Sequence, residues 1–132
     1  MVRMGLVVYG VNSNTELSQK LKPVIEWRSE VVQVKTLKRG DSIGYNRSFT
    51  ADVNMEIAVI PVGYGDGFRR SLGTGRGHVF IEGVKCKTLG NICMDMLMVD
   101  ITGKGILEGT PVEIIGKNQT LVNFAAQLDT IP

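Results

Sequence analysis

The sequence has few of the residues that build metal centres or disulfide frameworks. Its 132 residues include two cysteines, Cys86 and Cys93, and one histidine, His78. These are too few ligands for a structural zinc site. The two cysteines could pair, but no other feature suggests secretion, so we expect free thiols in a reducing compartment.

Long apolar runs and blocks of like charge are also absent from the sequence. The longest apolar stretches, such as residues 57–62, are far shorter than a membrane span. Arg3 is not followed by the apolar segment and small-residue cleavage site of a signal peptide. A net charge of +2, with basic and acidic residues interspersed, gives no footprint for nucleic acid or an anionic membrane. We therefore expect a cytoplasmic protein that binds neither nucleic acid nor a membrane.

Glycine is abundant, and the apolar pattern is mainly that of strands. A hydrophobic share of 43% is ordinary for one globular domain with a core, and 16 glycines suit the many tight turns of an all-β domain. Strand-like patterns occur at residues 32–35, 57–62, 78–81, 84–89, 96–101 and 110–115. About six strands at short spacing predict a mainly β fold, barrel-like or sandwich-like.

Two short helices and one further strand complete the expected elements. Asn14 or Thr15 is a candidate cap for a helix that ends before Pro23. Thr120 precedes an apolar stripe with helical spacing and is expected to cap a second helix. The apolar residues 1–9 are interpreted as a buried strand or strand end.

Four further features resemble functional motifs, but each has a simpler structural interpretation. Residues 39–42, Arg-Gly-Asp-Ser, spell a cell-adhesion motif, yet Gly-Asp is also common in β-turns, which we favour. The glycine-rich residues 73–77 lack the spacing of a phosphate-binding loop and are expected to form a hairpin loop. His78 is expected to be a packed or surface residue, and Trp27 a core or interface residue.

Four segments, in order and at similar spacing, resemble the alanine racemase family, and the similarity covers nearly the whole chain. They are Val2–Leu6 leading to Tyr9-Gly10, Gly44-Tyr45 with Ser48–Ala51, Gly63–Gly67, and Gly90–Asp95. The family fold is a (β/α)8 barrel followed by a β-rich domain, and a barrel takes about 250 residues. The resemblance therefore implies that residues 1–23 end the barrel, with its last strand and connection. Residues 24–132 would be the C-terminal β domain, truncated before the family's C-terminus.

The resemblance implies pyridoxal 5'-phosphate as the cofactor of the full-length enzyme. Gly5 and Leu6 match the residues that bind the cofactor phosphate through backbone N–H groups, where a glycine permits close approach. Arg3 matches the arginine that faces the pyridine nitrogen. Arginine holds its proton tightly, so this nitrogen stays largely unprotonated, which favours return of a proton to the substrate Cα over side reactions.

The resemblance also assigns Tyr45 as the catalytic residue. Racemisation needs a proton carrier on each face of Cα, and in the family a lysine serves one face and this tyrosine the other. A phenol in water titrates near pH 10, so a tyrosine base needs cationic neighbours or hydrogen bonds. The cofactor lysine has no counterpart in this chain.

Substrate binding is assigned to Tyr64, which matches a tyrosine at the substrate entrance, and to Met94, which matches a residue that contacts substrate through its backbone. Asp95 has a supporting role, and Cys93 is expected to pack because no histidine lies near it in sequence. In the family the catalytic tyrosine and this methionine reach the cofactor of the other subunit, which implies a homodimer with a composite active site.

The expected reaction is the interconversion of L- and D-alanine, supplying D-alanine for peptidoglycan. Two alternatives remain open: a racemase for serine or a broader range of amino acids, and a β interaction module without catalysis. A cofactor lysine in the residues that precede Met1 would favour the enzyme over the module.

We expect the 132-residue chain by itself to fold as a mainly β domain and to lack racemase activity, because the matching lysine and the barrel are missing. The measurement is D-alanine formed from L-alanine by the purified chain with added cofactor. Activity above background would contradict the assigned roles.

Overall fold

The computed structural model describes residues 5–12 and 14–132, and the predicted mainly β fold is confirmed. Seven antiparallel strands form one sheet in the order β1-β9-β6-β7-β8-β5-β2. The strands are β1 (Trp27–Glu30), β2 (Gln33–Leu37), β5 (Met55–Ile60), β6 (His78–Ile81), β7 (Val84–Leu89), β8 (Leu97–Asp100) and β9 (Pro111–Ile115). Two shorter strands, β3 (Ser42–Ile43) and β4 (Phe49–Thr50), form a separate hairpin.

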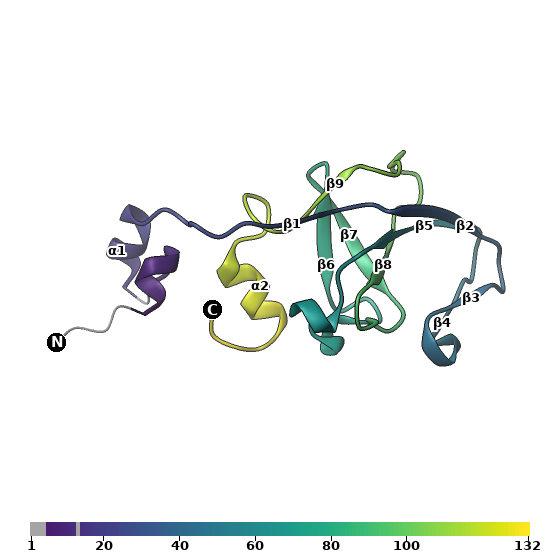
Figure 1. The fold of residues 1–132 in the computed structure, drawn as a ribbon, viewed down its shortest axis with the longest axis horizontal. Helices are drawn as coiled ribbons and strands as arrows, with labels where there is room; N and C mark the ends of the chain where they lie inside the picture. Colours follow the sequence, from purple (N-terminus) through teal and green to yellow (C-terminus); the bar gives the residue numbers. More distant parts are fainter. Residues whose placement is uncertain (1–4, 13) are drawn as a thin grey trace.

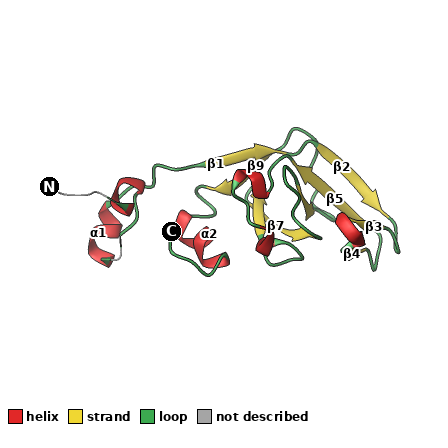
Figure 2. Ribbon diagram, turned by 60° about the horizontal axis from the view of Figure 1, so that its bottom comes forward, coloured by secondary structure: helices red, strands yellow, loops and turns green. Residues whose placement is uncertain are grey.

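The sheet curls because its two edge strands are consecutive in the sequence. Only Val31 and Val32 separate β1 from β2, and Figure 2 shows β1 leading directly into β2. The Val31 N–H donates to the Thr110 carbonyl at 2.9 Å, while the Val32 N–H donates to Val59 at 3.0 Å. The short connection between β1 and β2 thus joins the two edges of the sheet, and the sheet bends into a half-barrel.

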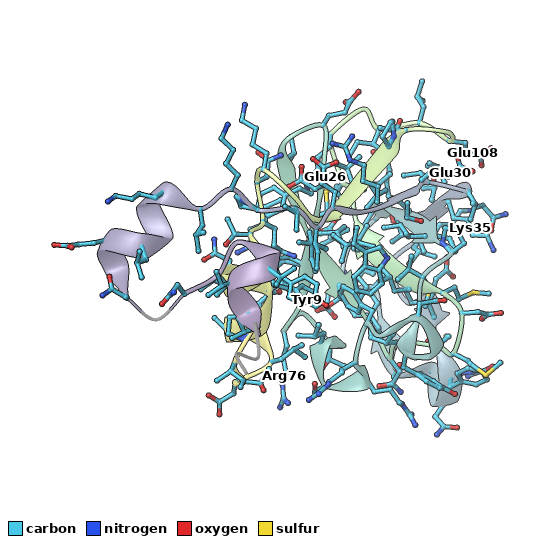
Figure 3. The ribbon with its side chains drawn as sticks, turned by 60° about the vertical axis from the view of Figure 1, so that its left-hand side comes forward. Tyr9, Glu26, Glu30, Lys35, Arg76 and Glu108 are labelled. Carbon is cyan, nitrogen blue, oxygen red and sulfur yellow. The ribbon has the colours of Figure 1, made fainter. Side chains whose placement is uncertain are left out.

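The loop before β9 covers part of the exposed edge of β2. The Val34 N–H donates to the Glu108 carboxylate at 3.0 Å. Glu30, Lys35 and Glu108 gather at this edge (Figure 3). Because charged side chains surround this edge of β2 and its Val34 N–H is already hydrogen-bonded, the edge is poorly suited to pair with a strand of another molecule.

Alternate residues of the strands form the core inside the curl. Positions along β6 and β8 alternate between partly and fully buried, as expected for strands with one face toward the core. A second, smaller core attaches the β3–β4 hairpin to the sheet. It contains Leu37, Ala51, Met55, Ile57 and Leu89, with Ile43, Phe49 and Met98 packed against it.

The predicted C-terminal helix is confirmed as α2 (Leu121–Gln127), and the Thr120 side chain caps it by accepting the Asn123 N–H at 3.2 Å. Phe124 of α2 packs against Trp27 and Phe68, with ring centroids 5.9 and 5.8 Å away. Trp27, predicted as a core or interface residue, is partly buried and packs against the main core.

The other helices are short. They are α1 (Thr15–Lys20) and the 3-10 helices η1 (Leu6–Tyr9), η2 (Tyr45–Arg47), η3 (Tyr64–Asp66) and η4 (Arg70–Leu72). Asn14 caps α1, because its side chain accepts the N–H groups of Glu16 and Leu17. No helix of residues 5–12 and 14–132 is long and apolar enough to cross a membrane.

The interpretation of residues 1–9 as a buried strand is wrong for the part that the structure describes. Residues 6–9 form η1, and all four side chains are exposed. An apolar run is compatible with either structure, and here local i to i+3 hydrogen bonds replace sheet partners. Residues 1–4 lie outside the described range.

The cell-adhesion motif is a β-turn, as predicted. The Asp41 N–H donates to the Lys38 carbonyl at 2.9 Å, and the Asp41 carboxylate accepts the Lys38 N–H at 2.8 Å. The carboxylate thus stabilises its own turn. The prediction of a hairpin loop at residues 73–77 is wrong, because these residues form turns that connect η4 to β6 and do not join two paired strands.

We expect Ile60→Ala to lower the free energy of unfolding by roughly 2–5 kcal/mol, because the change removes buried methylene groups and leaves a cavity. Ile60 is 0% exposed in β5. Val53→Ala, at a side chain that is 64% exposed, is the control and should change the free energy by no more than about 0.5 kcal/mol. Urea unfolding measures both, and equal effects would contradict the assignment of the core.

Candidate active site

The register of the sheet places the loops of the candidate site at one end. β5 pairs with β8 so that Ile60 lies opposite Leu97, and β7 pairs with β8 so that Leu89 lies opposite Met98. The residues after β5, after β7 and before β8 therefore share that end. These residues are the segments 61–67 and 90–96, which contain two of the four segments that carry the family resemblance.

Tyr64 and Met94 lie on loops that contact each other through their backbones. The Tyr64 N–H donates to the Cys93 carbonyl at 3.0 Å, and the Gly65 N–H donates to the Met94 carbonyl at 2.8 Å. A Cβ atom at Gly63 would lie 2.3 Å from the Cys93 carbonyl oxygen, so only glycine permits this approach. The two loops form one backbone unit that exposes both the Tyr64 and Met94 side chains.

Asp66 and Phe68 complete the Tyr64 loop. The Asp66 carboxylate accepts the Gly63 N–H at 2.9 Å, and the Phe68 N–H donates to the Gly63 carbonyl at 3.1 Å. Phe68 is fully buried and packs edge-on against Trp27, with centroids 6.4 Å apart. The loop is therefore anchored in the main core on one side and exposes Tyr64 on the other.

Tyr45 lies on the β3–β4 hairpin, in a turn with an unusual backbone. Gly44 has φ 78°, and two non-glycine residues, Asn46 (φ 58°) and Arg47 (φ 50°), are also left-handed. For a non-glycine residue this conformation costs roughly 1–2 kcal/mol. Such strain persists only where surrounding contacts hold it, and it is common at functional sites.

A side-chain hydrogen bond joins the Tyr45 turn to the Met94 loop. The Ser48 Oγ accepts the Asn91 N–H at 3.1 Å. A hollow of about 360 Å³ lies between the two segments, lined by Gly44, Tyr45, Cys93, Asp95, Met96 and Met98. The structure therefore brings three of the predicted residues, Tyr45, Tyr64 and Met94, onto adjoining segments.

The charges around this hollow have mixed signs. The Arg70 guanidinium lies 5.6 Å from the centre of the Tyr64 ring, close enough for a cation–π interaction. Burial raises the pKa of the Cys93 thiol, Asp95 raises it further and Arg70 lowers it. Because a thiol with a raised pKa is a poor nucleophile at neutral pH, a packing role suits Cys93.

Gly5 and Leu6 lie far from Tyr45 within the chain. Figure 1 shows η1 at one end of the long axis and the β3–β4 hairpin at the other. A single copy therefore does not bring the predicted phosphate-binding residues to the predicted catalytic tyrosine. Arg3 lies outside the described residues.

The backbone at Gly5 and Leu6 fits a phosphate. A Cβ atom at Gly5 would meet nothing within 4 Å, so a ligand can approach this backbone closely. Of the residues that the structure describes, none accepts a hydrogen bond from the N–H of Gly5 or Leu6. Free N–H groups at the start of a helical turn are the donors that a phosphate requires.

The remaining histidine and cysteine lie in strands of the sheet, His78 in β6 and Cys86 in β7. The backbone N–H of His78 donates to the Gln127 side chain at 3.2 Å. Burial, and to a lesser extent Lys85, lowers the pKa of the His78 imidazole. Cys86 is buried and, like Cys93, is a free thiol, as predicted. Within the described ranges no group of three or more candidate ligands could hold a metal ion.

Sequence reasoning missed the roles of two residues at the site, Ser48 and Arg70. Ser48 belongs to a segment that carries the resemblance, but its partner is a backbone N–H group 43 residues away, which sequence does not reveal. Arg70 follows Tyr64 by six residues, and only the tight turn at 63–68 returns it to the ring.

Comparison with known proteins agrees with this architecture. A family model described as the alanine racemase C-terminal domain matches residues 24–132. An alanine racemase of Cutibacterium acnes is 42% identical over 99% of this chain and 36% of its own length, and an amino-acid racemase of Enterococcus faecalis is 39% identical over 86% of this chain and 17% of its own. The chain thus spans about a third or less of the length of these curated relatives.

A solved structure has the same fold. The crystal structure of alanine racemase from Bartonella henselae, with covalently bound pyridoxal phosphate, superposes with a TM-score of 0.87 at 33% identity. The match covers 97% of this chain and 36% of that one.

We expect Asp95→Asn to speed alkylation of Cys93 by iodoacetamide several-fold at pH 7.5. The Asp95 carboxylate raises the pKa of the thiol, so its removal lowers that pKa and increases the thiolate fraction. Cys86 in the same protein is the control, since Asp95 does not contribute to its raised pKa. Mass spectrometry of the two peptides measures both rates, and an unchanged rate at Cys93 would contradict the electrostatic coupling.

Proposed function

The chain belongs to the alanine racemase family, whose C-terminal domain it contains, and on this basis we propose that it is part of a pyridoxal-phosphate-dependent alanine racemase. Residues 24–132 are the C-terminal β domain in this proposal, and residues 1–23 end the barrel domain. The observation that carries it is the arrangement of Tyr45, Tyr64 and Met94, which three hydrogen bonds hold on adjoining segments.

The active site is formed by two copies of the protein. η1 and the Tyr45 turn lie at opposite ends of one chain (Figure 1), so Gly5 and Leu6 of one copy serve the same site as Tyr45 and Met94 of the other. The exposed fraction of Tyr45, 69%, supports this arrangement. A large aromatic side chain with so little packing in its own chain is suited to a surface that a partner covers.

Each residue has a distinct role in the proposed site. The N–H groups of Gly5 and Leu6 would hold the cofactor phosphate, and the family resemblance assigns the pyridine nitrogen to Arg3, which lies outside the described residues. The cofactor, when bound, withdraws electrons from the substrate and so acidifies its Cα–H bond. The Tyr45 hydroxyl then carries the proton on one face of Cα, while Met94 binds substrate through its backbone and Tyr64 borders the entrance.

Alanine is the substrate that most relatives suggest. The proposed product, D-alanine, is a peptidoglycan precursor, and we place the enzyme in the cytoplasm, where its free buried thiols stay reduced.

A broader substrate range is a second candidate, because the relative from Enterococcus faecalis is an amino-acid racemase. Assay of the full-length protein with alanine and serine separates the two.

In the full-length protein, Tyr45→Phe should lower kcat by roughly 10²–10⁴-fold in both directions, because each direction needs a proton carrier on both faces of Cα. Phenylalanine has nearly the same volume, so Tm and cofactor absorbance should stay close to those of wild type. Racemisation of L- and D-alanine measures the effect.

Circular dichroism and the cofactor spectrum are the controls for fold and loading. A well-folded, loaded Tyr45→Phe protein with near wild-type turnover would exclude Tyr45 as the catalytic residue. A purely structural tyrosine would instead give a small change in Tm with normal turnover.

A further inference from the structure

Tyr45 has little in its own chain to hold its side chain. It is 69% exposed, and no described residue shares a hydrogen bond with its hydroxyl group. The placement of this side chain therefore depends first on the backbone of residues 44–47, which fixes where the Tyr45 Cβ atom lies. Proton transfer depends on placement, since a displacement of about 1 Å can cost about 100-fold in rate.

The backbone of this turn needs a contact from outside to keep its shape. The Arg47 N–H donates to the Gly44 carbonyl at 3.2 Å and closes the turn around Tyr45 and Asn46. Asn46 within the turn and Arg47 at its end are both left-handed non-glycine residues. This strained turn connects two strands of only two residues each. Its backbone would relax to conformations of lower energy unless a neighbouring element restrained it.

Ser48 supplies that contact from a confined position. Its Oγ accepts the Asn91 N–H at 3.1 Å. A Cβ atom at Gly44 would lie 2.8 Å from this oxygen, and one at Gly90 would lie 3.2 Å from it. Glycines on both segments thus leave just enough room for the hydroxyl group between the two loops.

The Asn91 segment is itself well fixed. Ile92 is 1% exposed, the Cys93 N–H donates to the Met96 carbonyl at 2.9 Å, and the Cys93 carbonyl accepts the Tyr64 N–H. A bond from Ser48 to Asn91 therefore ties the Tyr45 turn to the unit that presents Met94 and Tyr64.

We propose that Ser48 is the positioning residue for Tyr45: its hydroxyl group ties the strained Tyr45 turn to the Met94 loop and so sets the place of the phenol relative to the substrate. The proposal rests on the proposed racemase function. Ser48 does not touch the reacting atoms, and it acts through the backbone alone. Its loss should therefore affect turnover more than substrate binding.

The test uses the full-length protein and three variants. Ser48→Ala removes the hydroxyl group that accepts the Asn91 N–H, and Ser48→Thr keeps a hydroxyl group on the same Cβ atom. Ser42→Ala is the matched control, because the Ser42 hydroxyl group pairs with Thr50 at 3.2 Å within the same hairpin and does not reach the Asn91 segment. Steady-state kinetics, Tm and hydrogen–deuterium exchange of residues 90–96 are measured for each.

Ser48→Ala should lower kcat about tenfold with KM within about twofold, and should speed exchange in residues 90–96. Ser48→Thr should recover kcat to within about threefold of wild type, and Ser42→Ala should match wild type throughout. A Ser48→Ala enzyme with wild-type kcat, or with wild-type exchange, overturns the proposal. So does an equal loss of kcat in Ser42→Ala.

The outcomes also separate this role from the proposed function. If the wild-type full-length protein with bound cofactor racemises no amino acid, the proposed function fails and the role of Ser48 in it fails too. If the wild type is active and only the expected effects of Ser48→Ala are missing, the function stands and the role of Ser48 is overturned.

Discussion

The two-residue connection between β1 and β2 is the constraint on which the rest of the structure depends. Because Val31 and Val32 link strands at opposite edges of the sheet, the sheet has to curl, and the curl creates the enclosed core. Within this curled sheet, the register of β5, β7 and β8 sets the end at which the Tyr64 and Met94 loops meet.

The two parts of the site differ in how firmly they are held: the Tyr64 loop packs on the main core, whereas few contacts restrain the Tyr45 turn. Phe68, Trp27 and Phe124 pack together beneath the Tyr64 loop, so that loop inherits the stability of the main core. The Tyr45 turn lies beyond a small second core, and the hydrogen bond of Ser48 gives it a direct link to the Asn91 segment. The placement of Tyr45, the proposed catalytic residue, depends on backbone contacts more than on the packing of its own side chain.

The two halves of the proposed site lie at the two ends of the molecule. η1 offers free N–H groups near one end, and the hairpin offers an exposed tyrosine at the other (Figure 1). In the proposed function the complete site forms only between two copies of the protein, so the proposed activity depends on their association. Exposed apolar residues in both regions, such as Val8 and Met94, agree with surfaces that a partner copy covers in the proposed assembly.

The sequence by itself determined the fold class and most of the strands, because alternation of apolar residues records which face of each strand is buried. It also predicted the Thr120 cap and, through the family resemblance, named Tyr45, Tyr64 and Met94. The interpretation of residues 1–9 as a buried strand was wrong for residues 6–9. A short apolar run has no periodicity that distinguishes a strand from an exposed 3-10 turn. Only the tertiary structure showed that the Ser48 hydroxyl group meets the Asn91 N–H and that Arg70 meets the Tyr64 ring. These contacts depend on sheet register and on left-handed turns, which bring distant segments together and leave no local pattern in the chain.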